Sequence, residues 1–369
     1  MITIGNQATQ PVMSTTLRFG SVCSGVEAMS LACEPLGYTP AWFSEMAEEP
    51  SSVLAYHWPH VNNLGDMTTI PLLIRSGAIE APDILVGGTP CQAFSIAGLR
   101  GGLADPRGLL TKTFVEIGDE IDNHRKNPCT IWWENVVGCL NTKDNAFGNF
   151  IGALACGYEL HPNECKPQPG KTGKFWGWDE DTGQHYPKWP TVGYVVGPKR
   201  SLAWRVLDAK YFGSPQRRRR VFVVASAADG FDPLEVLFEP EGRSGSPQQG
   251  PEYRPPKHPG GFTPRAFDML GFGQYGDGEV ASTLKARDYK DATDLVVMPD
   301  GRVRRITPIE GERLQGMPDN HTLVPHKGKS MSDSARYKMI GNSMSVYVMR
   351  WIGGHLKRHL LRIGGLCKS

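Results

Sequence analysis

The sequence predicts an α/β fold: a doubly wound, mostly parallel sheet with helices on both faces, joined to a smaller irregular domain. Short apolar strand segments alternate with helical segments from residue 17 to about residue 225, which is typical of parallel sheets. Residues 226 to about 300 are instead rich in glycine, proline and charge, without a helical period. The chain has 369 residues, more than one hydrophobic core usually holds, so two domains are expected.

The expected elements follow one another in a regular order. Residues 1–16 are polar and are expected to form a tail, and LRFGSV (Leu17–Val22) is expected as the first strand. A glycine turn and a helix to about Leu36 come next, and further strands are expected at PAWFS, PDILV, TIWW and VFVVA. In TKTFVEIGDEI apolar residues recur at i, i+3 and i+7, which predicts a helix, and a last helix is expected from about Ser345 to Leu361.

Composition narrows the class of protein. The net charge is only +2, so a nucleic-acid surface would need local clusters such as the four consecutive arginines at 217–220. The eight cysteines form no CxxC pair, which argues against a zinc ribbon, and no metal site is expected. The sequence contains neither a recognisable signal peptide nor an apolar run of the roughly 20 residues that span a bilayer. We expect a cytoplasmic protein with free thiols.

A nucleoside pocket is expected at the carboxyl ends of the first strands. Ser24 and Gly25 stand in a tight turn between a strand and a helix, where backbone N–H groups can face a polar ligand. Glu45 follows Gly25 by twenty residues, at the end of the next strand, and suits a carboxylate that accepts hydrogen bonds from ribose hydroxyls. Asp66 ends a third segment and could accept from an adenine amino group. Since there is no Walker A lysine, the ligand is not expected to be a triphosphate.

Cys91 stands in GGTPCQAFS, directly after the predicted strand PDILV. By itself it is either a small buried residue or a nucleophile presented at the end of a strand. Glu134 and Asn135, in TIWWENV, end another predicted strand, and a carboxyl group there could act as an acid toward a bound ring.

The QRRRR segment precedes the strand VFVVA and is open to two interpretations. Four consecutive arginines can be a solvated basic edge. Side chains alternate along a strand, however, so Arg218 and Arg220 point to one side while Arg217 and Arg219 point to the other. One pair could then enter a site, with the other meeting phosphates or solvent.

Taken together, these motifs resemble the cytosine-C5 DNA methyltransferase family. SVCSG, the strand end at Glu45, GDM, GGTPCQAFS, ENV and QRRRR occur in the order of that family, followed by RRITPIEGERLQGMPD and YKMIGNSMSV. The family usually has an aromatic residue at the position of Cys23, two glycines at Glu27 and Ala28, and often a tryptophan at Met46. These departures resemble the phage and prophage branch of the family.

The resemblance implies a catalytic role for four residues. Cys91 would add to C6 of cytosine, while Glu134 would hold or protonate N3 and contact the exocyclic amine. Arg218 and Arg220 would bind the O2 side of the base and the phosphate. C5 would then take the methyl group of S-adenosylmethionine, leaving S-adenosylhomocysteine. The target base would have to be flipped out of the duplex.

The resemblance also implies the residues that bind cofactor and DNA. The domains would be residues 17–228 and 325–369 for catalysis and cofactor binding, and 229–324 for target recognition. The partner would be double-stranded DNA. The protein would act as a monomer, and no membrane is expected to take part. The expected DNA contacts are Ser95 in a mobile lid, Gln216, Lys285 and Arg287. The expected cofactor contacts are Cys23, Ser24, Gly25, Val26, Glu45, Met46, Asp66, Met67, Pro90, Leu110, Asn342 and Ser343.

Three alternatives remain beside this interpretation. One is methylation of tRNA, by a branch with similar motifs but without a large recognition domain, and another is an inactive relative that only binds DNA. A nicotinamide oxidoreductase would share the sheet but lacks GxGxxG here and leaves Cys91 and Glu134 unexplained. The tryptophans between Phe175 and Trp189 are expected to pack a local core, with auxiliary DNA contacts as the other possibility.

Overall fold

The structure is a computed structural model, and it describes residues 16–89, 106–238, 265–271, 274–278, 281–285, 294–297 and 303–364. Its centre is a seven-stranded sheet with strands in the order β2-β1-β3-β4-β9-β8-β7. The strands are β1 (Leu17–Val22), β2 (Tyr38–Ser44), β3 (Ile84–Gly87), β4 (Thr130–Val136), β7 (Val192–Val196), β8 (Ser201–Asp208) and β9 (Arg219–Ser226).

The sheet is parallel over its first half and antiparallel over its second. β2, β1, β3 and β4 are mutually parallel, whereas β9 runs antiparallel to both β4 and β8. Strand side chains alternate between the two faces, so neighbours such as Trp132 and Trp133 enter different cores. The expected mostly parallel α/β sheet is confirmed, although VFVVA forms an antiparallel strand.

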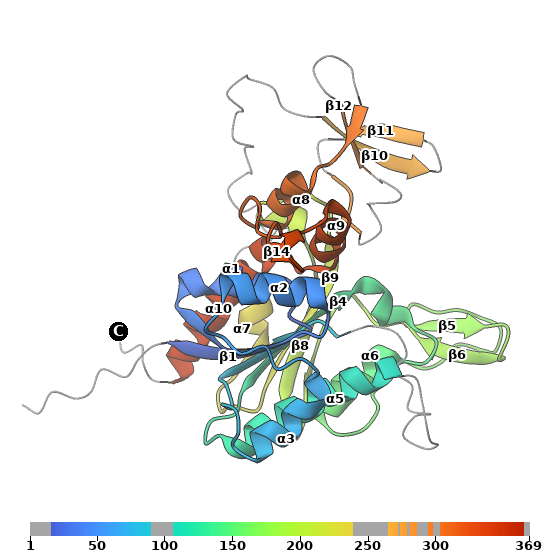
Figure 1. Cartoon of the computed structure of the whole chain (residues 1–369). Coiled ribbons are helices and arrows are strands. Elements are labelled where there is room, and N and C mark those ends of the chain that lie inside the picture. The colour runs from blue at the N-terminus through green and yellow to red at the C-terminus, as the bar shows by residue number, and fades with distance from the viewer. Residues whose placement is uncertain are drawn as a thin grey trace, which may run out of the picture.

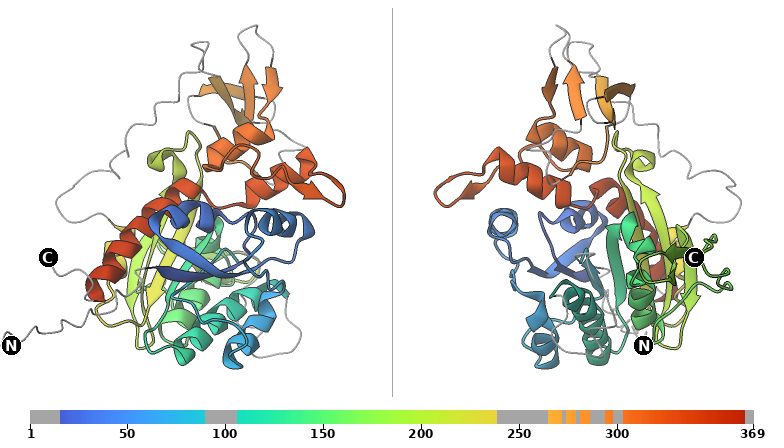
Figure 2. Two further views of the ribbon diagram at one scale, coloured as in Figure 1. Left: turned by 60° about the vertical axis from the view of Figure 1, so that its left-hand side comes forward. Right: turned by 90° about the vertical axis from the view of Figure 1, so that its right-hand side faces the viewer.

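Helices cover both faces of this sheet (Figure 1). One face packs against α1 (Ala28–Cys33), α2 (Glu48–His57), α7 (Pro233–Leu237) and α10 (Val346–Ile363), and Figure 2 shows the long α10 lying across the strands. The other face packs against α3 (Ile70–Arg75), α5 (Pro106–His124) and α6 (Ala146–Ala155). The helical period predicted in α5 buries Phe114, Ile117 and Ile121 completely. Short 3₁₀ helices at η1 (Glu34–Leu36), η2 (Met67–Thr69), η3 (Val137–Asn141) and η4 (Ala209–Phe212) complete this part.

A second, antiparallel sheet stands above the first one (Figure 1). Its strand order is β11-β10-β12-β13, formed by β10 (Arg265–Gly271), β11 (Gln274–Gly278), β12 (Asp294–Val297) and β13 (Val303–Arg305). The composition of this segment does not predict its strands. Between the two sheets lie α8 (Pro308–Gln315), the short hairpin β14 (Pro325–His326) and β15 (Lys329–Ser330), and α9 (Asp333–Asn342). The expected domain boundaries at residues 229 and 324 stay a prediction.

The tryptophan-rich insertion forms a hairpin that projects from the side of the molecule near α6 (Figure 1). Its strands are β5 (Trp176–Asp179) and β6 (Gln184–Pro187). Trp176 is buried and its indole N–H donates to the Glu164 carbonyl, while the Trp178 ring packs edge-on against His185. Trp189 belongs to the main core. The expected local packing is therefore observed for Trp176 and Trp178, but it is wrong for Trp189, which packs into the core beneath the main sheet.

A buried ion pair fastens α8 to α9. The Glu312 side chain is fully buried, and its Oε1 accepts hydrogen bonds from Arg336 Nη2 at 3.1 Å and from the Thr322 amide at 2.9 Å. Its Oε2 accepts from the Asn320 amide at 2.7 Å. Removing one partner of such a pair leaves an uncompensated buried charge.

Arg336→Ala is expected to lower the free energy of unfolding by about 3–5 kcal/mol, because Glu312 would lose its cation. Chemical denaturation measures this change. Asp319→Ala, which removes the half-exposed partner of Arg313, is the matched control and should cost only a small fraction as much. If both variants lost the same free energy of unfolding, burial would not be what makes the Glu312–Arg336 pair important.

Among the described residues, no helix combines the length and apolar character needed to cross a bilayer.

Candidate active site

The candidate site lies where the strands of the parallel half end. β1, β3 and β4 end at one edge of the sheet, and β9 begins there, with Val136 opposite Arg220. The glycine turn, the chain leading to Cys91, the ENV segment and the arginine run are therefore neighbours, although they are far apart in the sequence. This edge faces α8 and α9 (Figure 1).

The glycine turn and Glu45 are directly connected. The Gly25 amide donates to Glu45 Oε2 at 2.9 Å, and the Ala47 amide donates to Oε1 at 2.8 Å. The Ser24 hydroxyl accepts from the Ser44 amide at 3.1 Å and so ties the turn to the end of β2. Each carboxylate oxygen of Glu45 retains acceptor capacity beyond its backbone donor. The turn and the acidic strand end, which were both expected at a nucleoside pocket, are therefore neighbours, and the binding of a nucleoside there stays a prediction.

Two sulfur-containing side chains, Cys23 and Met67, lie in contact beside this turn. Cys23 Sγ lies 3.8 Å from Met67 Sδ, and burial, aided by the charge of Glu45, raises the pKa of Cys23 to about 12. This thiol is thus neutral at physiological pH and serves as an apolar contact. Asp66 caps the following 3₁₀ helix by accepting from the Thr68 amide at 2.9 Å. Met46 is 69% exposed, so it covers no buried surface in this structure.

The chain before Cys91 is held against β4. Asn135 Nδ2 donates to the Thr89 carbonyl at 2.8 Å, and Trp133 Nε1 donates to the Thr89 hydroxyl at 3.0 Å. At Gly88 a Cβ would lie 3.4 Å from Glu134 Oε2, so the backbone passes close to that carboxyl group. Cys91 itself lies outside the described residues. Gly88 and Thr89, which follow β3, are nevertheless held beside β4 by these contacts.

Glu134 is a buried carboxyl group flanked by two arginines. Its Oε1 lies 3.3 Å from Arg220 Nε, and the residue is only 8% exposed. Burial raises the pKa of Glu134, although the charges of Arg220 and Arg218 act in the opposite direction. The protonated form, which can donate a hydrogen bond, is favoured more than in a solvated glutamate.

Arg218 joins three segments of the chain. Its guanidinium donates to the carbonyls of Leu284 at 3.2 Å, Gly341 at 3.0 Å and Ser343 at 2.6 Å. Burial and the charge of Arg220 lower its pKa, whereas the carbonyl acceptors favour its charged form. Arg217 and Arg219 are exposed, so the side chains alternate as the strand pattern predicts.

A small cavity of about 60 Å³ connects the glycine turn to Glu134. Asn342, Ser343 and Met344 line it from the end of α9, and Gly88 lines it from the end of β3. The remaining lining residues are Ser21, Cys23, Ser24, Gly25, Glu27, Ala28, Met29 and Val86. Six of the expected site residues therefore line one space: Cys23, Ser24, Gly25, Glu134, Asn342 and Ser343.

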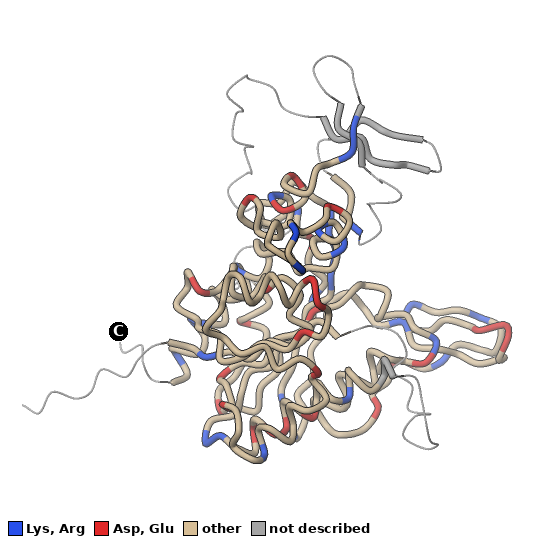
Figure 3. The backbone as a smooth tube through the Cα atoms, viewed as in Figure 1, with Lys and Arg blue, Asp and Glu red and all other residues tan. Residues whose placement is uncertain are grey.

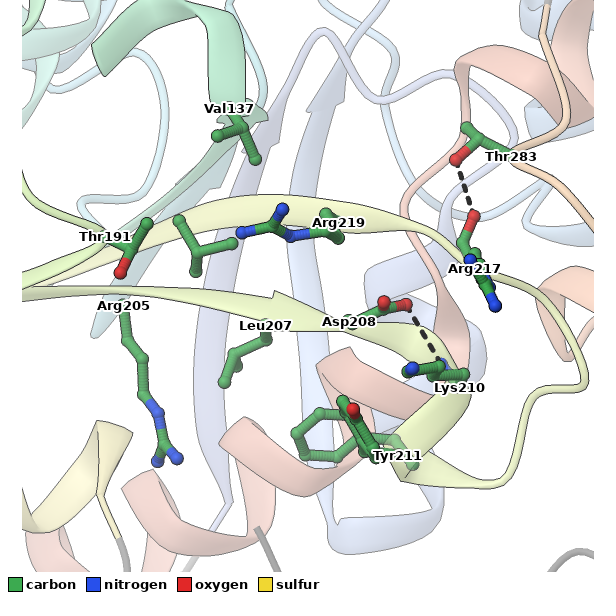
Figure 4. A pocket seen from close by; sticks show the side chains of 12 residues that line it. Val137, Thr191, Arg205, Leu207, Asp208, Lys210, Tyr211, Arg217, Arg219 and Thr283 are labelled. Atoms are coloured by element: carbon green, nitrogen blue, oxygen red, sulfur yellow. Dashed lines mark hydrogen bonds between the residues drawn. The ribbon is translucent and has the colours of Figure 1, made fainter. Parts of the chain in front are cut away.

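A second, larger cavity of about 680 Å³ lies beside this edge, on the other side of the arginine run (Figure 4). Arg205, Lys210, Arg217 and Arg219 line it, and Asp208 is the acidic residue of the lining. Asp208 Oδ1 accepts from the Lys210 amide, and the Thr283 hydroxyl donates to the Arg217 carbonyl (Figure 4). Charges of both signs are mixed over the rest of the described chain (Figure 3), so this basic lining is a local feature.

The remaining expected residues are more dispersed. Val26 is buried and its carbonyl accepts from His321, while Leu110 packs partly buried against the α5 core. Gln216 is fully buried and forms a β-bridge with Ala281, and Lys285 is exposed. Four expected residues lie outside the described part of the chain: Pro90, Cys91, Ser95 and Arg287.

Sequence reasoning missed several residues of the site. Thr89 and Gly88 carry no chemical signal of their own, and only the folded contacts with Asn135 and Glu134 reveal them. Glu27 stands where a glycine is usual in the family it resembles, and the sequence does not predict it in the pocket, which it lines. Within the described ranges, no three His, Cys, Asp or Glu side chains are grouped to hold a metal ion.

Comparison with known proteins shows to which family the chain belongs. The model of the C-5 cytosine-specific DNA methylase family matches residues 17–166, 188–245 and 269–358, which is most of the chain. The unmatched segment 167–187 contains the β5–β6 hairpin, so this element is an addition to the common core.

Individual relatives are also named methyltransferases, although one of them is named for adenine. A protein of Escherichia phage P1, named DNA N-6-adenine-methyltransferase, is 41% identical and covers 94% of this chain. The chain spans 62% of the length of that relative. The Type II methyltransferase M2.BsuMI of Bacillus subtilis is 26% identical, over 92% of this chain and 75% of its own. Among solved structures, the Entamoeba histolytica methyltransferase EhMeth has the same fold, with a TM-score of 0.57 at 14% identity over 96% of this chain and 99% of its own. With its central sheet, its site at the strand ends and this match over most of its length, the chain belongs to the C-5 cytosine-specific DNA methylase family.

Proposed function

We propose that this methyltransferase transfers a methyl group from S-adenosylmethionine to C5 of a cytosine in double-stranded DNA. The observation that carries the proposal is the cavity that runs from the glycine turn to the buried Glu134. The cavity is lined by Gly25, whose amide binds the proposed ribose acceptor Glu45, and by Glu134, the proposed acid beside Arg220.

Cys91 would act as the nucleophile and Glu134 as the acid. A thiolate that adds to C6 of the pyrimidine makes C5 nucleophilic, and a proton or hydrogen bond at N3 makes that addition easier. The raised pKa of Glu134 suits a donor to N3, and Arg220 at 3.3 Å keeps its carboxyl group in place. Loss of the C5 proton to a base and elimination then free the cysteine. Arg218, held by three carbonyls, is the rigid support beside this pair.

The residues of the edge fit S-adenosylmethionine. Glu45 can accept from ribose hydroxyls, Asp66 and Met67 stand beside the nucleoside position, and the small cavity receives the amino-acid end. When bound, the cofactor supplies an electrophilic methyl group on a sulfonium. The turn at Ser24 and Gly25 would orient it toward Glu134 and the base.

Double-stranded DNA is the proposed partner, with the target cytosine flipped out of the stack to reach the strand ends. Residues 229–324, including Lys285 and the undescribed Arg287, are proposed to recognise the sequence, and Ser95 to lie in a closing segment. Since the phage P1 relative is named for adenine, N6 of adenine is the second acceptor to be measured.

The proposal is tested with purified protein and S-adenosylmethionine, with unmethylated genomic DNA and tRNA as substrates in separate reactions. Nucleoside mass spectrometry of the product should reveal 5-methylcytosine, and bisulfite sequencing should place it in one flanking sequence. If N6-methyladenine forms without 5-methylcytosine, the acceptor is adenine and not cytosine. If only tRNA is methylated, the substrate is RNA and not DNA. If neither methylated base forms with any of these substrates, DNA binding without methyl transfer is the function that remains.

The larger basic cavity predicts a contact with the DNA backbone. Neither Arg217 nor Arg219 makes a hydrogen bond or ion pair through its guanidinium among the described residues, so both are available to phosphates. The double variant Arg217→Ala/Arg219→Ala should weaken DNA binding, and the slope of log K against log salt should fall by about 1 for each arginine.

Fluorescence anisotropy at several salt concentrations measures this slope. Arg358→Ala is the matched control, because Arg358 is exposed on α10 and does not line the cavity. An unchanged slope in the double variant would remove the cavity from the DNA-binding surface.

A further inference from the structure

Glu27 is a buried carboxylate with an unused oxygen. The residue is 1% exposed, and its Oε1 accepts from the Ser30 amide at 3.1 Å at the start of α1. Its Oε2 has no hydrogen-bond partner among the described residues. Among the described residues, Ser21 and Ser30 act on its pKa as hydrogen-bond donors that favour the charged form, and Glu34 acts against that form; no lysine or arginine is among the groups that act on it.

This arrangement is costly for the free protein. Burial raises the pKa of Glu27 to about 8, since a buried carboxylate without a cation is disfavoured. The backbone of Glu27 also has a φ of 61°, in the left-handed region that glycine adopts more easily. Capping one amide of a six-residue helix does not require such a residue, because a serine or aspartate in ordinary conformation does the same. A strained, buried and unsatisfied group of this kind points to a ligand.

The position of Glu27 says which part of a ligand it meets. Glu27 lines the small cavity together with Ser24, Gly25 and Ser343, and Glu134 lines it as well. Glu45 and Asp66, which suit the nucleoside, do not line it. The end of S-adenosylmethionine that enters this space is therefore its amino-acid end, which carries an α-ammonium group.

We propose that Glu27 binds the α-ammonium group of the cofactor's amino-acid end through its free Oε2. This inference rests on the proposed use of S-adenosylmethionine. A charge-assisted hydrogen bond to the ammonium group completes the hydrogen bonding of the carboxylate and supplies its missing counter-ion. Glu27 is then a specificity-determining residue that distinguishes amino-acid-bearing nucleosides from those without the amine.

Isothermal titration calorimetry with two probes tests the proposal. One is S-adenosylhomocysteine and the other is its analogue in which hydrogen replaces the α-amino group. Glu27→Gln keeps the shape of the side chain and an oxygen that can cap Ser30. It is expected to weaken S-adenosylhomocysteine about 10- to 100-fold and to leave the deamino analogue within about twofold.

Two further variants make the result decisive. Glu27→Gly suits the backbone at a φ of 61°, so it should fold even where another substitution does not, and should lose the same selectivity. Glu45→Gln is the matched control, since loss of a ribose acceptor should weaken both probes equally.

Equal weakening of both probes by Glu27→Gln, or no weakening of either, would overturn the role of Glu27. Failure of both probes to bind the unmodified protein is a different result. It would overturn the proposed cofactor, and the assignment of Glu27 with it.

Discussion

Cys91→Ser is expected to abolish methyl transfer, with a loss of at least about 10⁴-fold in the single-turnover rate. A serine hydroxyl is a far weaker nucleophile than a thiolate, and removal of a covalent nucleophile is among the most costly changes to an enzyme. Binding of DNA and of S-adenosylhomocysteine should remain close to that of the unmodified protein, because the residues proposed for both contacts are unchanged.

DNA containing 5-fluorocytosine tests the covalent step directly. With S-adenosylmethionine present, C5 takes the methyl group but its fluorine cannot leave as a proton does, so the unmodified protein should form a stable adduct that survives denaturing electrophoresis. Cys91→Ser should form none. Cys165→Ser is the matched control, since Cys165 is an exposed free cysteine outside the site, and this variant should still be trapped. An adduct with Cys91→Ser would assign the nucleophile to another residue.

Glu134→Gln is expected to slow methyl transfer by about 10²- to 10⁴-fold, which is the usual range for a positioned acid. The amide is the same size and remains buried, but it has no acidic proton for N3. The loss should appear in kcat more than in the binding of DNA, because the contact matters most as the base accepts the thiolate.

The pH profile separates this role from a structural one. Because the pKa of Glu134 is raised by burial, its protonated form persists to higher pH than in a solvated glutamate and is lost as the pH rises further. The rate of the unmodified protein should therefore fall on the alkaline side of its profile. Glu134→Gln should lack that alkaline limb, and a profile identical to that of the unmodified protein would contradict the assignment. Equal melting temperatures would exclude unfolding as the cause.

The parallel half of the fold could be predicted because its signals are local. Each of its strands is a short apolar run before a polar turn, and the first strand was predicted with its observed bounds of Leu17–Val22. α5 was predicted from a period that buries Phe114 and Ile117. By contrast, β7 has alternating exposed and half-buried residues at an edge of the sheet, which is a weaker signal.

The site could be predicted only where the chemistry of a residue is visible in the sequence. Glu45 and Glu134 are polar residues at the ends of parallel strands, so the edge of the sheet brings them together. Arg218 precedes β9 and reaches the same edge because β9 runs antiparallel to β4. The role of Thr89 as an anchor depends on Trp133 and Asn135, more than forty positions away, and no local pattern reports such a contact. Likewise, the free oxygen of Glu27 becomes visible only when the surrounding helix and sheet are in place.

The three acceptors of Arg218 have a consequence for the order in which the protein matures. During synthesis, Cys91 and Glu134 leave the ribosome long before the carbonyls of Gly341 and Ser343, which lie more than 120 positions beyond Arg218. Until then the guanidinium has no complete set of partners, and burying it would be unfavourable. A growing chain that already carries Cys91 and Glu134, the proposed nucleophile and acid, therefore lacks the partners that hold Arg218. Competence should come late, in one step, when the last two helices dock.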